Sequence, residues 1–196
     1  MDSSDDEYPK FPEFRLPPSR KERCGFEWSV WRRQFELVAQ LRNLDDGDAK
    51  SHAMISMKGE AASRILDIGT GPNDGPDMVT LAMYLDRLEA RFSPAPGSER
   101  AKIEFENETQ EIQRGDANDK IGDLQIYKNR LDYFWKRAFP NRDEDHPELR
   151  NKFIRGLADA RVRESVQDQN PSTITEALNL AQHVTANIEI MRMNRV

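Results

Sequence analysis

The sequence contains one cysteine, Cys24, among its 196 residues. One cysteine cannot form an internal disulfide, and no cysteines and histidines have zinc-site spacing, so we expect a reducing, intracellular setting. No apolar run approaches the ~20 residues that a membrane-spanning helix needs. The acidic start MDSSDDEYPK has no apolar core of a signal peptide. We therefore expect a cytoplasmic protein without a membrane span.

The chain also has no excess of basic residues. It carries 29 lysines and arginines against 35 aspartates and glutamates, a formal net charge of −6. Proteins dedicated to nucleic acid usually have a basic balance, because contacts to phosphates supply most of their affinity. The composition argues against nucleic-acid binding as the main role of this chain.

Residue sets typical of catalysis are missing too. His52, His146 and His183 are far apart and have no histidine partner at i+4, which favours ordinary surface or helix-end positions. DANDKIGD has the acidic residues of a calcium loop, but Lys120 and Tyr127 occupy positions where oxygen ligands belong. GTGPNDG lacks the GK[ST] of a phosphate loop. We expect no enzyme activity, no metal and no cofactor.

What the sequence does contain is helical periodicity along most of its length. In FEWSVWRRQFELVAQL, apolar residues at positions 28, 31, 35, 38 and 41 predict one buried helix face. Similar stripes predict helices at about 47–56, 59–68, 78–92, 99–113, 119–138, 147–155, 159–168 and 173–191. No segment alternates convincingly as a strand, so the predicted fold is all-α with about nine helices.

Proline and glycine divide this pattern into two small helical lobes, which 196 residues can accommodate. The stretch SPAPGS predicts an interdomain linker. The predicted organisation is an acidic, proline-rich tail at 1–22, a first lobe at 23–93, a linker at 94–98 and a second lobe at 99–196. The tail carries Phe11, Phe14 and Leu16 at near-alternating spacing. Two interpretations remain open: the tail docks as an extended strand in a groove, or it is disordered.

The motifs of the second half occur in a characteristic order: F-x-P, a helix with E-F, Q-x-G, Y-x-x-R-L, K-F-I-x-G-L with R-x-x-V, and T-I-x-E-A-x-x-x-A. They lie at Phe92 and Pro94, Ala101, Glu104 and Phe105, Gln113 and Gly115, Tyr127, Arg130, Leu131 and Phe134, Lys152 through Leu157 with Arg163 and Val166, and Thr173 through Ala181. The first half adds LPP, two tryptophans and QFE, from Leu16 to Glu36. Over about residues 14 to 190 the chain resembles the capsid region of Gag from gypsy-type LTR retrotransposons, a family that includes the domesticated neuronal protein Arc.

Two features depart from that family. The spacing from Gly115 to Tyr127 is longer than usual, and no zinc knuckle follows before Val196. Two readings stay open: a capsid fragment of a longer Gag, or a capsid-only descendant.

The resemblance implies a self-assembling structural protein whose lobes form pentamers and hexamers and join them into shells. Such shells enclose RNA, bound through a region absent from this chain, and form intracellular particles, released in vesicles if the protein is Arc-like. The outer face of the first helix then offers candidate subunit contacts at Arg32, Arg33 and Glu36. On the long helix, Trp135 lies off the inward face and is a further candidate, with a buried edge position as the alternative.

The resemblance also implies a second function from a different class. First lobes of Arc-like proteins bind peptides, so this chain could be an adaptor for extended proline- and aromatic-rich segments. The groove would lie between the helices that carry Trp28, Phe35, Leu81 and Leu85. The chain's own Phe11, Phe14 and Leu16 could occupy it as an internal ligand.

Overall fold

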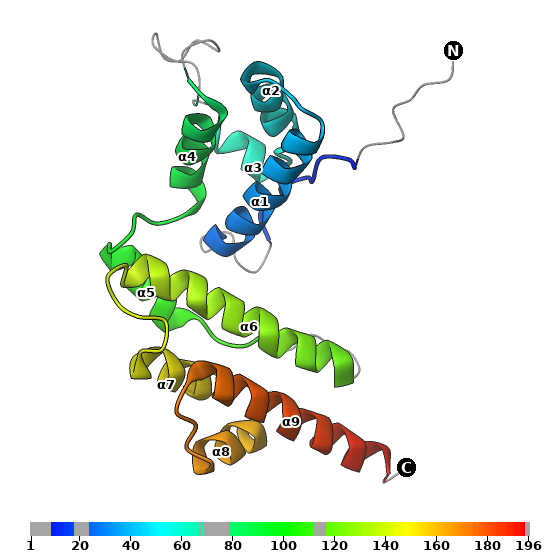
Figure 1. Cartoon of the computed structure of the whole chain (residues 1–196), viewed down its shortest axis with the longest axis vertical. Coiled ribbons are helices and arrows are strands. Elements are labelled where there is room, and N and C mark those ends of the chain that lie inside the picture. The colour runs from blue at the N-terminus through cyan, green and yellow to red at the C-terminus, as the bar shows by residue number, and fades with distance from the viewer. Residues whose placement is uncertain (1–8, 18–23, 67, 69–78, 112–116, 195–196) are drawn as a thin grey trace. The chain divides into compact units, whose positions relative to one another are not determined.

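The computed structural model describes residues 9–17, 24–66, 68, 79–111 and 117–194 (Figure 1). Within these ranges the chain forms nine α-helices and one isolated β-bridge, which confirms the all-α prediction. Several predicted features lie outside the described residues: most of the tail, the loop at 69–76, Met78, and the turn with Gln113 and Gly115. The chain divides into two compact units, Met1–Pro94 (unit 1) and Ala95–Val196 (unit 2).

Unit 1 contains α1 (Gly25–Leu41), α2 (Asp46–Ser56), the single turn α3 (Glu60–Ser63) and α4 (Leu81–Phe92). Side chains cap two of these helices where the sequence changes from turn to helix. Asp45 accepts a hydrogen bond from the Asp48 N–H at 2.8 Å, and Thr80 accepts one from the Met83 N–H at 3.3 Å. These caps satisfy N–H groups that the first helical turn cannot satisfy itself.

The core of unit 1 is rich in aromatic side chains. The residues at 28, 31, 35 and 38 of α1 are buried, as their spacing predicts, whereas Leu41 is 55% exposed. A helix turns by about 100° per residue, so a step of three positions falls short of a full turn by about 60°. The two such steps from Phe35 to Val38 and on to Leu41 therefore rotate Leu41 away from the face that carries Trp28. The fully buried rings and chains of this core include Trp28, Phe35, Leu85, Leu88 and Phe92.

Unit 2 contains α5 (Glu99–Asn107), α6 (Ala117–Ala138), α7 (Pro147–Arg155), α8 (Ala160–Asp168) and α9 (Ile174–Met193). The long helices α6 and α9 run antiparallel and side by side (Figure 1). Helix α5 packs on α6, while α7 and α8 pack on α9. Pro147 stands in the first turn of α7, where its missing N–H costs no hydrogen bond.

Helix α5 ends at Asn107, before the predicted end at 113. The next residues pair with the loop after α7: the Gln110 N–H donates to the Gly156 carbonyl at 3.0 Å, and the Gln110 side chain accepts from the Ala158 N–H at 3.0 Å. Thr109 is exposed. Hydrogen bonds to a distant loop therefore replace the last predicted helical turn.

The turn after α7 also requires glycine at position 156. The Tyr127 hydroxyl donates to the Lys152 carbonyl at 3.3 Å and lies so close to Gly156 that an added Cβ would be 1.9 Å from its oxygen. Burial raises the pKa of Tyr127, which is consistent with a neutral, hydrogen-bonded hydroxyl. The absence of a side chain at 156 therefore lets α6 and the end of α7 approach closely.

Part of the predicted linker belongs to unit 2. Gly97 has a positive φ of 72°, and its N–H donates to the Arg137 carbonyl at 2.6 Å near the end of α6. Ser98 caps α5 by accepting from the Ala101 N–H at 3.2 Å. Of the linker predicted at 94–98, Pro94 belongs to unit 1 and the residues from Ala95 onwards belong to unit 2.

Candidate functional site

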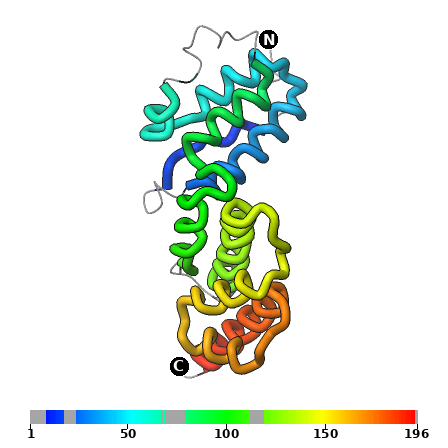
Figure 2. Tube along the Cα trace, turned by 90° about the vertical axis from the view of Figure 1, so that its left-hand side faces the viewer, coloured from blue at the N-terminus to red at the C-terminus, as the bar shows by residue number. Residues whose placement is uncertain are grey.

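Residues 9–17 run in an extended conformation against the helices of unit 1, along the dark-blue trace of Figure 2. Phe14 forms a parallel β-bridge with Met57, just after α2. The Phe14 N–H donates to the Ser56 carbonyl at 2.9 Å, and the Phe14 carbonyl accepts from the Lys58 N–H at 3.0 Å. Of the two interpretations of the tail, docking is what the structure shows for residues 9–17, through one β-bridge rather than a full strand.

The Phe14 side chain is part of the core of unit 1. It is 3% exposed, and its ring meets Trp28 edge-on, with centroids 5.3 Å apart and planes at 89°. The Phe14 centroid also lies 5.8 Å from Trp31 and 5.0 Å from Phe92. Edge-to-face pairs at such distances stabilise by about 0.5–1.5 kcal/mol beyond the area they bury. The segment is therefore anchored by one aromatic residue inserted among rings from α1 and α4.

Polar groups of α1 and of Arg42, the residue that follows it, bind the backbone of this segment. The indole N–H of Trp31 donates to the Pro12 carbonyl at 2.8 Å, and the guanidinium of Arg42 donates to the Pro9 carbonyl at 2.9 Å. Arg42 also lies 4.9 Å above the Phe11 ring, within cation–π range. These bonds satisfy backbone carbonyls that an extended chain would otherwise leave to water.

Phe11 forms a second, shallower anchor. Its ring stacks on His52 of α2 at 4.5 Å and lies 5.0 Å from Phe35 of α1. Phe11 is only partly buried, as is Leu16 beyond Phe14. The segment therefore has one deep and two shallow apolar contacts.

The structure brings together only part of the predicted groove. Trp28 contacts Phe14, and Phe35 contacts Phe11. Leu85 is fully buried and Leu81 partly buried in the same apolar core.

Four residues that contact the docked segment were not identified from the sequence: Trp31, Arg42, His52 and Phe92. The indole N–H of Trp31 was an available signal, because a buried tryptophan usually finds an acceptor.

The outer face of α1 carries an ion-pair network. Arg32 donates to Glu36 at 3.0 Å on its own helix, and to Asp86 at 2.7 Å and Glu89 at 2.8 Å on α4. Burial alone would lower the pKa of Arg32, but these hydrogen bonds raise it above its ordinary value. Arg32 therefore joins α1 to α4 within unit 1, whereas Arg33 and Glu36 are exposed.

We expect Arg32→Met to lower the free energy of unfolding of unit 1 by about 1–2 kcal/mol, because it removes a partly buried cation shared by three carboxylates. The loss should shrink in high salt, which already screens the network. Arg33→Met on the same helix is the matched control and should change stability by less than about 0.5 kcal/mol. Urea unfolding followed by tryptophan fluorescence measures both variants. Equal effects would contradict the role assigned to Arg32.

The prediction that Trp135 is an exposed contact is wrong. Its side chain is fully buried in unit 2, and its indole N–H donates to the Asp143 carbonyl at 3.0 Å. The ring lies 4.6 Å from Phe139 and 5.3 Å from Phe105. The helical period places Trp135 next to the apolar face of α6 that includes Phe134, and not on it. The chain after Ala138 turns back over α6 and buries the side of the helix that carries Trp135.

The described part of the chain contains no group of three or more histidine, cysteine, aspartate or glutamate side chains placed to hold a metal ion. Among the helices that the structure describes, none is long and apolar enough to cross a membrane.

No protein-family model, no curated protein and no solved structure matches this chain.

Proposed function

We propose that this chain is a self-assembling structural protein of the Gag capsid type, from a retrotransposon or a domesticated descendant. The observation that supports this best is its division into two compact, helical units at Pro94. That boundary lies at the F-x-P motif and next to the linker predicted at 94–98. Intracellular particles that enclose RNA follow from the same proposal, with the RNA held chiefly by sequences other than this acidic chain.

Exposed side chains on α1 offer a surface for such assembly. Val30, Leu37 and Leu41 are 41%, 55% and 55% exposed and share one face, next to the exposed Arg33. Small contacts of this kind are weak singly, but a closed symmetric shell repeats them many times. The proposal therefore needs no large apolar interface on either unit.

We expect assembly to depend on salt, because copies with a net charge of −6 repel one another until ions screen them. Light scattering should report single chains at about 0.01 M salt and large particles at about 1 M, where the screening length falls from about 30 Å to about 3 Å. Negative-stain microscopy of the same samples should show closed shells. Single chains at every salt and protein concentration would contradict the proposal.

A second candidate function is peptide binding by unit 1, and the docked segment favours it. Residues 9–17 combine a backbone bridge with side chains inserted into apolar sites, a mode by which domains recognise extended peptides. In this proposal the segment is an internal ligand that an external peptide can replace. The test is whether the chain without residues 1–22 binds a synthetic peptide of residues 9–17; unchanged melting and no binding would defeat it.

A further inference from the structure

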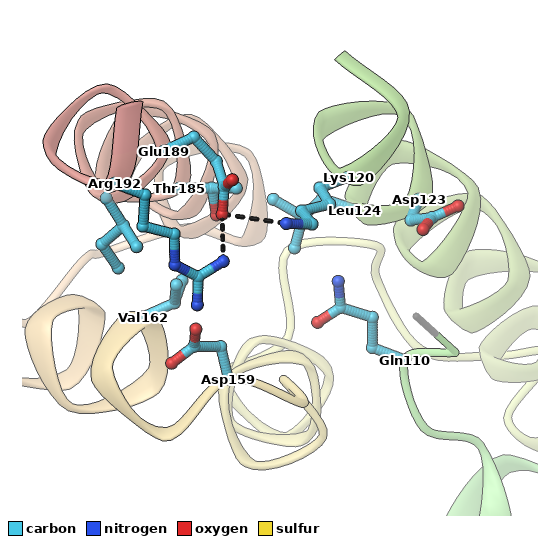
Figure 3. A pocket seen from close by; sticks show the side chains of 10 residues that line it. Gln110, Lys120, Asp123, Leu124, Asp159, Val162, Thr185, Glu189 and Arg192 are labelled. Atoms are coloured by element: carbon cyan, nitrogen blue, oxygen red, sulfur yellow. Dashed lines mark hydrogen bonds and ion pairs between the residues drawn. The ribbon is translucent and has the colours of Figure 1, made fainter. Parts of the chain in front are cut away.

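Unit 2 contains a pocket of about 260 Å³ where the start of α6, the start of α8 and the end of α9 converge (Figure 3). Its polar lining includes Gln110, Lys120, Asp159, Thr185, Glu189 and Arg192. Nothing in the proposed assembly or peptide binding uses this pocket, so its ligand is a separate question.

The apolar part of the lining comes from three helices. Leu124 of α6 is 1% exposed and Val162 of α8 is 4% exposed, and Ile188 of α9 completes this surface. An engineered apolar cavity of about 150 Å³ is large enough to bind benzene. The pocket therefore has room for a benzene-sized body and for a polar head group beside it.

The polar wall carries an excess of positive charge at one place. Lys120 donates to Glu189 Oε1 at 2.9 Å, and Arg192 donates to the same oxygen at 2.5 Å. The hydrogen bond from Lys120 lowers the pKa of Glu189, so this carboxylate is ionised near neutral pH. Together, Lys120, Arg192 and Glu189 carry one net positive charge. Lys120 and Arg192 also have N–H groups that do not donate to Glu189.

Gln110 adds a further donor from the opposite side. Its side-chain oxygen accepts from the Ala158 N–H at 3.0 Å, which orients the amide nitrogen towards the pocket. Figure 3 shows the nitrogen atoms of Gln110 and Lys120 facing the same space. The arrangement presents donors on two sides of one opening.

The acidic residues of the lining oppose a negative ligand only weakly. Asp159 is ionised, because its hydrogen bonds with the Arg161 guanidinium, at 3.3 and 3.0 Å, lower its pKa, and the positive charge of Arg161 offsets its negative charge. The Asp123 carboxylate points away from the centre of the pocket in Figure 3. With the charge of Asp159 offset by Arg161, the trio of Lys120, Arg192 and Glu189 leaves one net positive charge at the opening.

We propose that this pocket binds a small organic carboxylate with an apolar body about the size of a benzene ring. The carboxylate accepts hydrogen bonds from Lys120, Gln110 and Arg192, and the body lies on Leu124, Val162 and Ile188. Such a ligand joins α6 to the end of α9, and it stabilises unit 2 because it binds only the folded pocket.

The test is a titration of the full chain with benzoate, followed by NMR chemical shifts or calorimetry. We expect saturable binding with a dissociation constant on the order of 1 mM, as suits a ligand of this size. Benzylammonium has a similar body and the opposite charge, and it should not saturate the pocket. Acetate, which lacks the body, should bind at least about tenfold more weakly, because burying a ring contributes more than about 1.4 kcal/mol.

Gln110→Glu is the decisive variant, because it keeps the oxygen that accepts from Ala158 and replaces the donor with a negative charge. It should weaken benzoate binding at least about tenfold. Gln125→Glu makes the same chemical change on the exposed side of α6 and should leave binding unchanged. If Gln110→Glu does not fold, Lys120→Gln takes its place and should also weaken binding. No saturable binding, equal binding of benzylammonium, or no effect of the folded pocket variant would each overturn the proposal.

Discussion

Replacing Phe14 by alanine is expected to lower the free energy of unfolding of unit 1 by about 3–5 kcal/mol, the usual cost of removing a buried phenylalanine ring. The ring is 3% exposed and meets Trp28, Trp31 and Phe92, so its removal leaves a cavity among three aromatic side chains. Domains of this size have a total stability of about 5–15 kcal/mol, so the effect is large. Urea unfolding measured by tryptophan fluorescence reports it, because Trp28 and Trp31 surround the site.

Arg15→Ala is the matched control, since Arg15 lies on the same segment with its side chain 68% exposed. It should change the free energy of unfolding by less than about 0.5 kcal/mol. A chain without residues 1–22 should regain stability when a peptide of residues 9–17 is added, but not when that peptide carries alanine in place of Phe14. Similar stability of Phe14→Ala and the unaltered chain would mean that the docked strand contributes little to unit 1.

Replacing Trp135 by alanine is expected to destabilise unit 2 by about 3–5 kcal/mol, because this fully buried ring packs between Phe105 and Phe139. Trp135→Phe keeps most of the ring contacts and removes the hydrogen bond to the Asp143 carbonyl. It should cost about 1–3 kcal/mol, the penalty for a buried acceptor left without a donor. Thermal unfolding followed by circular dichroism measures both variants.

Lys136→Ala, at the exposed position next to Trp135, is the control and should change stability by less than about 0.5 kcal/mol. A Trp135→Ala protein that unfolds at the usual temperature but fails to assemble would reverse our conclusion and return Trp135 to the contact surface.

Much of the helical structure could be predicted from local signals. Pro147 opens α7, and Thr173 caps α9 by accepting from the Glu176 N–H at 3.1 Å. The Glu176 carboxylate accepts in turn from the Ser172 N–H at 2.6 Å, and backbone hydrogen bonds from Ser172 and Thr173 lower its pKa. Such signals are readable because caps and proline act within a few residues of the chain.

The candidate sites were less predictable, because they depend on which distant residues meet. Phe11 and Phe14 are apolar in a proline-rich stretch, a pattern that permits both docking and disorder. Only the β-bridge of Phe14 with Met57 and the ring cluster with Trp28 decide for docking. The pocket in unit 2 was missed altogether, since Gln110, Lys120 and Glu189 come from three separate segments.

The sequence by itself determined that this protein is helical, where most helices begin, and which stripe of each helix is apolar. Helical period and caps express forces between residues close in the chain, so these features need no knowledge of the fold. Only the tertiary structure decided what each face packs against. It made Arg32, a candidate subunit contact by sequence, a link between α1 and α4, and it buried Trp135 under the chain that follows α6. Both outcomes arise from contacts between segments whose meeting no local pattern encodes.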